Sequence, residues 1–188
     1  MASEASPTAW PERCCVPALV WDAARYYDVH LNPRPLAFEL GVRLAVGDDN
    51  PWNLPFAREG DAIGVDMHDL LTRWNSLEPY RSHGIILSHV PIRSLDVPLE
   101  VWISRHDHCY VGVGLNYPHY FGITQSGEVR HVLRLVSVSG RRAEVYDPSR
   151  PELGGTTWDS RRLEDSMEAV DDGLWLFDRR LPSSSDCA

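Results

Sequence analysis

The alternation of apolar and polar residues is most regular between His131 and Asp147, where it predicts a β-hairpin. Residues 132–138 alternate branched apolar with polar side chains, Ser139-Gly140 supplies a turn, and residues 143–146 return as the partner strand. A histidine opens the first strand and an aspartate closes the second. Because the outer ends of an antiparallel pair lie side by side, we expect these two side chains to meet.

The N-terminal part of the chain shows helical spacing instead. Apolar residues recur every three or four positions, and Pro17 suits a first helical turn because its missing N–H would have no partner there, so we predict a helix over residues 16–28. The stretch Gly47–Gly64 is rich in breakers and indicates a long loop, a candidate substrate lid or pocket wall. Two more helices are expected around it, over residues 35–45 and, capped by Asp66, over residues 67–74.

Beyond residue 80 the pattern changes to strands. Besides the hairpin, whose first strand extends over Val129–Val138, we predict strands over Gly84–Leu87, Leu99–Ser104, Tyr110–Leu115, Tyr120–Thr124 and Leu174–Phe177, and a short helix near Arg161–Val170. Helices followed by a mostly antiparallel sheet favour an α+β fold. We expect one catalytic domain over residues 10–181, with a helical lobe (about 10–80) packed on a sheet lobe (about 81–181), and disordered ends at 1–9 and 182–188.

Composition narrows the function classes. A net charge of -9 without a basic run argues against nucleic acid or an anionic membrane as the main partner. All eighteen basic residues are arginine, which removes lysine Schiff-base chemistry and is typical of a GC-rich bacterial genome. The N-terminus does not resemble a signal peptide, and four poorly spaced cysteines indicate free thiols in a reducing cytoplasm.

Cys15 is the leading candidate for a nucleophile. It stands at the start of the first predicted helix, where unpaired N–H groups stabilise a thiolate and can lower a cysteine pKa from ~8.5 to roughly 3.5–7.5. With His131 as base and Asp147 as its orienting carboxylate it would complete a catalytic triad. Each member also has a plainer interpretation: a buried thiol, a strand histidine and a turn aspartate. Cys14 is the competing nucleophile, but it lies one residue farther from the helix.

These residues resemble a known family. The sequence from Cys15 through Pro17-Ala18 to Tyr26-Tyr27 looks like the Cys-x-Pro-Ala-x-Leu...Tyr-Tyr-Gly opening of papain-like bacterial proteins of the C39-like type. His131...Asp147-Pro148 looks like their His...Asp-Pro hairpin at the same sixteen-residue offset. The segment Pro98–Ser104 is similar to a strand in butirosin-type acyltransferases, which move an acyl group from a carrier-protein thioester to an amine. The resemblance covers about residues 10–30 and 98–150 and implies a papain-like fold with Cys15, His131 and Asp147 as the triad.

One departure from the family bears on the reaction. C39-type and papain-type enzymes carry a glutamine six residues before the cysteine, which completes the oxyanion hole. This chain has Ala9 there, or Thr8 if Cys14 is the nucleophile. Losing such a donor typically costs ~2.7–4 kcal/mol of barrier. The missing donor would slow amide hydrolysis more than acyl transfer from an activated thioester. The departure therefore makes a peptidase a less favoured interpretation.

The sequence therefore favours cysteine-dependent acyl transfer through a covalent thioester, in a secondary-metabolite pathway. By resemblance, the donor would be an acyl carrier protein or a coenzyme A thioester, and the acceptor an amine, a peptide or an internal nucleophile that closes a ring. No cofactor is expected, and the sequence does not fix the oligomeric state. Two alternatives stay open: a cysteine peptidase or amidase, and a catalytically silent papain-like domain that binds a carrier protein or peptide.

Several remaining motifs are weaker. His106 and His108 would face one side of a strand, as two metal ligands require, but no second ligand cluster stands out, so we expect no metal. Gly112 and Gly114 indicate close approach to a strand backbone, by substrate or by ordinary packing. The aromatic run 116–121 could line an acyl pocket or pack on the core. The single histidines His68, His83, His89 and His119 are expected to be surface or capping residues.

Overall fold

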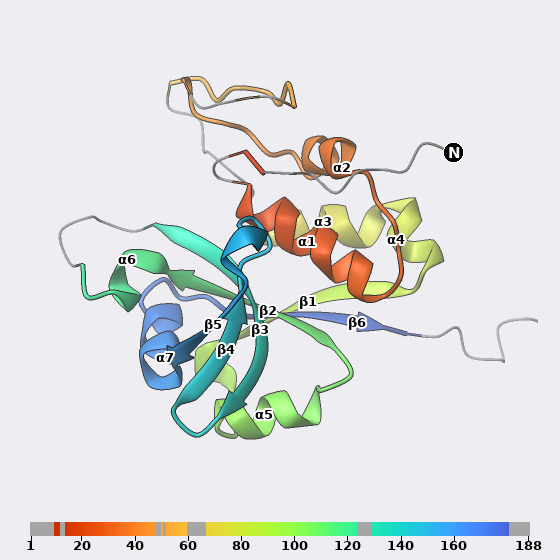
Figure 1. The fold of residues 1–188 in the computed structure, drawn as a ribbon. Helices are drawn as coiled ribbons and strands as arrows, with labels where there is room; N and C mark the ends of the chain where they lie inside the picture. The colour runs from red at the N-terminus through yellow and green to blue at the C-terminus, as the bar shows by residue number, and fades with distance from the viewer. Residues whose placement is uncertain are drawn as a thin grey trace, which may run out of the picture.

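The computed structural model describes residues 10–11, 14–47, 50, 52–59, 67–123 and 129–180. Its centre is a six-stranded sheet in the order β1-β6-β2-β3-β4-β5, in which every neighbouring pair is antiparallel (Figure 1). The strands are β1 (Ile85–Pro91), β2 (Tyr110–Asn116), β3 (Arg130–Ser139), β4 (Arg142–Tyr146), β5 (Gly155–Asp159) and β6 (Gly173–Arg179). The predicted hairpin is the β3–β4 pair, with Gly140 at φ 55° in its turn.

Helices cover both faces of this sheet. In Figure 1, α1 to α4 lie on one face, while α5 and α7 lie on the other. Their bounds are α1 (Cys15–Tyr26), α2 (Pro33–Glu39), α3 (Met67–Ser76), α4 (Glu78–Ser82), α5 (Leu99–Arg105), α6 (Tyr117–Tyr120) and α7 (Ser160–Glu168), with 3₁₀ turns at Ile92–Ser94 and Pro151–Leu153. Each face therefore has its own apolar core, one built around α1 and the other around α7. Within the described ranges, no helix is both long enough and apolar enough to cross a bilayer.

Helix α1 lies directly on the central strand β2. A Cβ added to Gly112 would come within 2.6 Å of Leu19 Cδ2, so a larger residue here would force the Leu19 side chain to shift. At the far end of the helix, the Tyr27 hydroxyl donates to the Phe177 carbonyl at 2.6 Å and accepts from the Tyr110 N–H at 3.1 Å. These contacts fix the position of α1 along the sheet. The close approach predicted at Gly112 is thus packing by a helix.

Helix α2 is shorter than predicted. It ends at Glu39 rather than near residue 45, because Gly41 takes a φ of 77°. The Gly41 N–H then bonds the Phe38 carbonyl and the Val42 N–H bonds the Ala37 carbonyl, which is the Schellman pattern that closes a helix. The predicted loop begins a few residues later. Phe56 within this loop forms an isolated parallel bridge with Leu44, which precedes the loop, whereas Asp66 lies outside the described residues.

Two predicted strands are wrong. Leu99–Ser104 belongs to helix α5, in which the buried residues Leu99 and Trp102 stand three apart, at helical spacing. The segment that the sequence analysis likened to a strand of butirosin-type acyltransferases is therefore helical in this protein. Tyr120 ends helix α6, which Asn116 caps through its side chain, and the chain then turns at Gly122 with φ 72°; Thr124 lies outside the described residues.

The other predicted elements are present, and the structure adds some that the sequence pattern did not indicate. The first helix, the helix over 67–74, the helix near 161–170 and the strands that became β1, β2, β3, β4 and β6 all form. The additions are α4, α6 and the edge strand β5. Helices packed on an antiparallel sheet confirm the α+β prediction, while the division into two lobes stays a prediction, and residues 1–9 and 182–188 lie outside the described part.

Candidate active site

The two adjacent cysteines occupy different environments. Cys15 is the first residue of α1 and is half-buried, whereas Cys14 sits at the N-cap position with 1% of its surface exposed. The N–H groups of the first turn of a helix have no partner within the helix and carry a partial positive charge. Cys15 therefore combines access to solvent with the position at the start of a helix that the sequence predicted.

His131 and Asp147 meet as predicted from the hairpin. His131 Nε2 lies 2.9 Å from Asp147 Oδ2, and both side chains are largely buried. The other carboxylate oxygen, Oδ1, accepts hydrogen bonds from the Ser149 N–H at 2.9 Å and the Ser149 hydroxyl at 2.6 Å. Because Nε2 is hydrogen-bonded to Asp147, the other ring nitrogen of His131, Nδ1, can interact with a second partner.

That second partner is Cys15. Burial by itself would lower the pKa of His131, but hydrogen bonds to Asp147 and Cys15, together with the charges of both groups, outweigh it and raise the pKa to about 9. Burial acts to raise the pKa of Asp147, and the hydrogen bonds from His131 and Ser149 outweigh it and lower the pKa. The structure thus brings sulfur, imidazole and carboxylate into contact in that order.

Aromatic residues pack beside the imidazole. The ring centroid of Tyr117 lies 5.3 Å from that of His131, nearly edge-on, and Tyr117 in turn contacts Phe121 at 5.0 Å. Tyr120 stacks on Trp158 of strand β5 at 4.0 Å. The aromatic run therefore packs as a cluster, and through Tyr117 it also forms one side of the candidate site.

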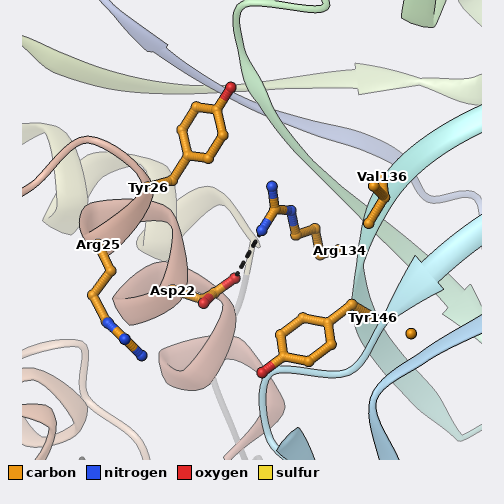
Figure 2. Close-up of a pocket in the computed structure, with 7 residues that line it drawn as sticks. Asp22, Arg25, Tyr26, Arg134, Val136 and Tyr146 are labelled. Atoms are coloured by element: carbon orange, nitrogen blue, oxygen red, sulfur yellow. Dashed lines mark ion pairs between the residues drawn. The ribbon is translucent and has the colours of Figure 1, made fainter.

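A pocket of about 530 Å³ opens along the flank of α1. Figure 2 shows Asp22 of the helix pointing toward Arg134, with a dashed line marking their ion pair. Arg134 Nη1 lies 3.7 Å from Asp22 Oδ2, and its guanidinium also lies over the rings of Tyr26 and Tyr110, at 5.2 and 4.8 Å. The lining residues are Asp22, Arg25, Tyr26, Arg134, Val136, Tyr146 and Gly155.

A second histidine–aspartate pair was missed by the sequence analysis. His89 Nε2 lies 3.0 Å from Asp172 Oδ1, and both side chains are mostly buried. His89 is therefore neither a surface nor a capping residue, so that expectation is wrong. The two residues are 83 positions apart and meet only because β1 pairs with β6, and no local pattern signals this.

The predicted arrangement around His106 is also wrong. Residues 106–109 form a turn between α5 and β2, where the His106 ring stacks on Trp102 at 3.8 Å and bonds the Trp102 carbonyl. His108 instead lies near Cys109 and Asp178, whose candidate ligand atoms all fall within 4.8 Å of one another. Burial and the Asp178 charge raise the pKa of the Cys109 thiol to about 11, which opposes the thiolate that a metal would need.

Comparison with known proteins supports the fold. No protein-family model matches the chain, and neither does any curated protein. The chain matches the crystal structure of a candidate C39-like peptidase from Bacillus anthracis with a TM-score of 0.59 and 14% identity, over 90% of this chain and 90% of that one. This likeness confirms the predicted C39-like, papain-like fold. At 14% identity it shows the fold alone, so the likeness to butirosin-type acyltransferases stays a prediction.

Proposed function

We propose that this protein is a cysteine-dependent acyltransferase, with Cys15 as nucleophile, His131 as proton carrier and Asp147 as the carboxylate that orients His131. The observation that carries the proposal is the contact of all three side chains at the N-terminus of α1. The raised pKa of His131 and the helix N-terminus both favour a thiolate–imidazolium pair.

In the proposed reaction, His131 Nδ1 takes the proton of the Cys15 thiol, and the sulfur attacks the carbonyl carbon of an acyl thioester. The tetrahedral intermediate collapses, the donor thiol leaves with the proton from His131, and the acyl group remains on Cys15. An amine or an internal nucleophile then attacks this thioester and gives its proton to His131. Collapse of the second intermediate returns that proton to the Cys15 sulfur, and Asp147 stabilises the imidazolium in both stages.

The pocket beside α1 supports a thioester donor that carries phosphate. It is built on the same three elements as the triad: Asp22 lies seven residues beyond Cys15 on α1, Arg134 three beyond His131 on β3, and Tyr146 directly precedes Asp147. Helix and strand rises separate Asp22 from Cys15, and Arg134 from His131, by about 10 Å. Arg25 and Arg134 offer guanidinium groups, which suit phosphate binding. Coenzyme A and carrier proteins both present their thioester on a phosphopantetheine arm that can span this distance.

A cysteine peptidase is the second candidate, because the matched crystal structure is of a candidate C39-like peptidase. The two functions differ in the fate of the acyl group on Cys15. An amidase would pass it to water at a rate that added amines do not change. A transferase would pass it to an amine.

The test is intact-mass spectrometry of the protein with acetyl-coenzyme A and with acetyl-N-acetylcysteamine. We expect a covalent acetyl adduct that Cys15→Ala abolishes and the matched control Cys14→Ala retains. Adding a panel of amines should discharge the adduct into amides. An adduct that persists in Cys15→Ala would refute the nucleophile, and fast turnover of peptide amides without transfer to amines would favour the peptidase. A Cys15 thiol that reacts with none of the acyl donors would favour the third alternative, a catalytically silent binding domain.

A further inference from the structure

The second histidine–aspartate pair contains a buried carboxylate, whose desolvation must be offset by hydrogen bonds. Asp172 is 6% exposed, and its Oδ1 accepts from three donors: His89 Nε2 at 3.0 Å, the Gly173 N–H at 2.8 Å and the Trp175 indole N–H at 3.1 Å. Burial acts to raise the pKa of Asp172, and these hydrogen bonds outweigh it and lower the pKa. A buried carboxylate with this many partners is held ionised and fixed in place.

Contacts with β2 place this pair at the end of the sheet where α1 begins. Asp22 of α1 and Tyr27, the residue directly after the helix, contact Tyr110, and Leu19 lies on Gly112. Helix and strand therefore run in opposite directions. One helical turn before Leu19, about 6 Å, leads to Cys15, and two residues beyond Gly112, about 7 Å, lead to Gly114.

Asp172 lies over that same Gly114. A Cβ there would collide with both carboxylate oxygens of Asp172, so only glycine admits this side chain. Cys15 packs against the apolar cluster that contains Val132, the β3 partner of Gly114, and Trp175, the donor to Asp172. The thiol and the Asp172 carboxylate thus occupy the same end of the same sheet face.

His89 and His131 belong to strands on opposite sides of the central strand β2. In the sheet, β3 with His131 is the neighbour of β2 on one side, and β1 with His89 follows β6 on the other. The His89 side chain is 17% exposed, and within the described residues its second ring nitrogen, Nδ1, has no hydrogen-bond partner. His89 Nδ1 is therefore a polar atom without a partner among the described residues, on a strand that lies on the other side of β2 from His131.

We propose that His89, oriented by Asp172, donates a hydrogen bond from Nδ1–H to the oxyanion formed when Cys15 attacks a carbonyl carbon. The inference rests on the proposed function. Ala9 stands where related enzymes carry the oxyanion glutamine, and an oxyanion hole with only backbone donors would leave one donor missing. Because Nε2–H is committed to Asp172, the donating form is the imidazolium, and the Asp172 carboxylate compensates its charge. No bond to His89 forms or breaks.

Two reagents separate this role from a structural one. Acetylation of Cys15 by acetyl-N-acetylcysteamine passes through an oxyanion, whereas alkylation by iodoacetamide is a direct displacement that forms none. We expect His89→Ala to slow acetylation about 10²- to 10³-fold and to leave the alkylation rate of Cys15 unchanged. His89→Gln, which keeps a neutral N–H donor, should recover part of the loss. Asp172→Asn should show the same selective loss as His89→Ala.

The matched control is His106→Gln, a half-buried histidine in the turn after α5, which should change neither rate. Equal acetylation by wild type and His89→Ala would overturn the inference and leave the proposed function intact. An equal loss of both rates, or a loss of the folded thermal transition without rescue in His89→Gln, would make His89 structural. Absence of any Cys15 adduct in the wild-type protein would overturn the proposed function and this inference together.

Discussion

His131 and Asp147 are joined by a 2.9 Å hydrogen bond between Nε2 and Oδ2 at the open end of the β3–β4 hairpin. The bond fixes which ring nitrogen is free, and that nitrogen serves Cys15. Ser149 holds the opposite carboxylate oxygen, so Asp147 cannot easily rotate away. One local hairpin thus presents an oriented base to a helix that begins more than a hundred residues earlier.

Replacing Asp147 with Asn should slow acylation of Cys15 by about two to four orders of magnitude, because the amide can present the ring in the wrong tautomer and cannot stabilise its cation. The pKa of His131 should fall below its present value of about 9. Histidine NMR titration and the pH dependence of iodoacetamide labelling measure the two effects. Ser149→Ala, which removes one of two bonds to Oδ1, is the milder comparison. An unchanged pKa in Asp147→Asn would contradict the assignment.

Stability should depend on pH through His131. Its pKa rises from 6.5 to about 9 on folding, so its contribution is fully present below pH 6.5 and is lost as the pH rises through about 9. The contribution is on the order of 3 kcal/mol at most. Urea unfolding on either side of this window should show the loss in wild type and a smaller loss in Cys15→Ala, which removes one cause of the shift. A flat profile in wild type would count against the coupled pair.

Gly114→Ala should destabilise the protein by roughly 1–3 kcal/mol, because the new methyl group displaces the Asp172 carboxylate from its three donors. Gly155→Ala is the matched control in strand β5, where the nearest atom to an added Cβ is the Val145 carbonyl oxygen at 4.0 Å. Thermal or denaturant unfolding of both variants measures the difference. Similar stability of the two would show that Asp172 relocates without cost.

Arg25→Gln should raise the KM for acetyl-coenzyme A about tenfold and leave the KM for acetyl-N-acetylcysteamine unchanged, because only the first substrate carries phosphate. Arg25 suits this test better than Arg134, whose loss would strand the Asp22 carboxylate. Arg93→Gln, on the surface beside Asp171, controls for net charge. An equal change in KM for the two thioesters would show that Arg25 does not bind the phosphate of the donor.

Local sequence patterns predicted the elements in which the spacing of apolar residues, or a turn motif, is clear. The hairpin followed from alternation and a Ser-Gly turn, and α1 from helical spacing after Cys15, so the pairing of His131 with Asp147 could be predicted before any coordinates. The same reasoning failed at Leu99–Ser104, because a short apolar segment fits a strand or a buried helix equally well. It also failed at Gly41, where a left-handed turn ends α2 early.

The sequence by itself therefore determined the base–carboxylate pair, the candidate nucleophile and the α+β class, because each depends on residues close together in the chain. Tertiary structure alone decided the rest. The sheet order brings His89 to Asp172 across 83 residues, the packing of Leu19 on Gly112 sets where Cys15 lies, and the pairing of β2 with β3 brings His131 to that point. Register between distant strands is fixed by the burial of whole faces, a property that no local window of residues contains.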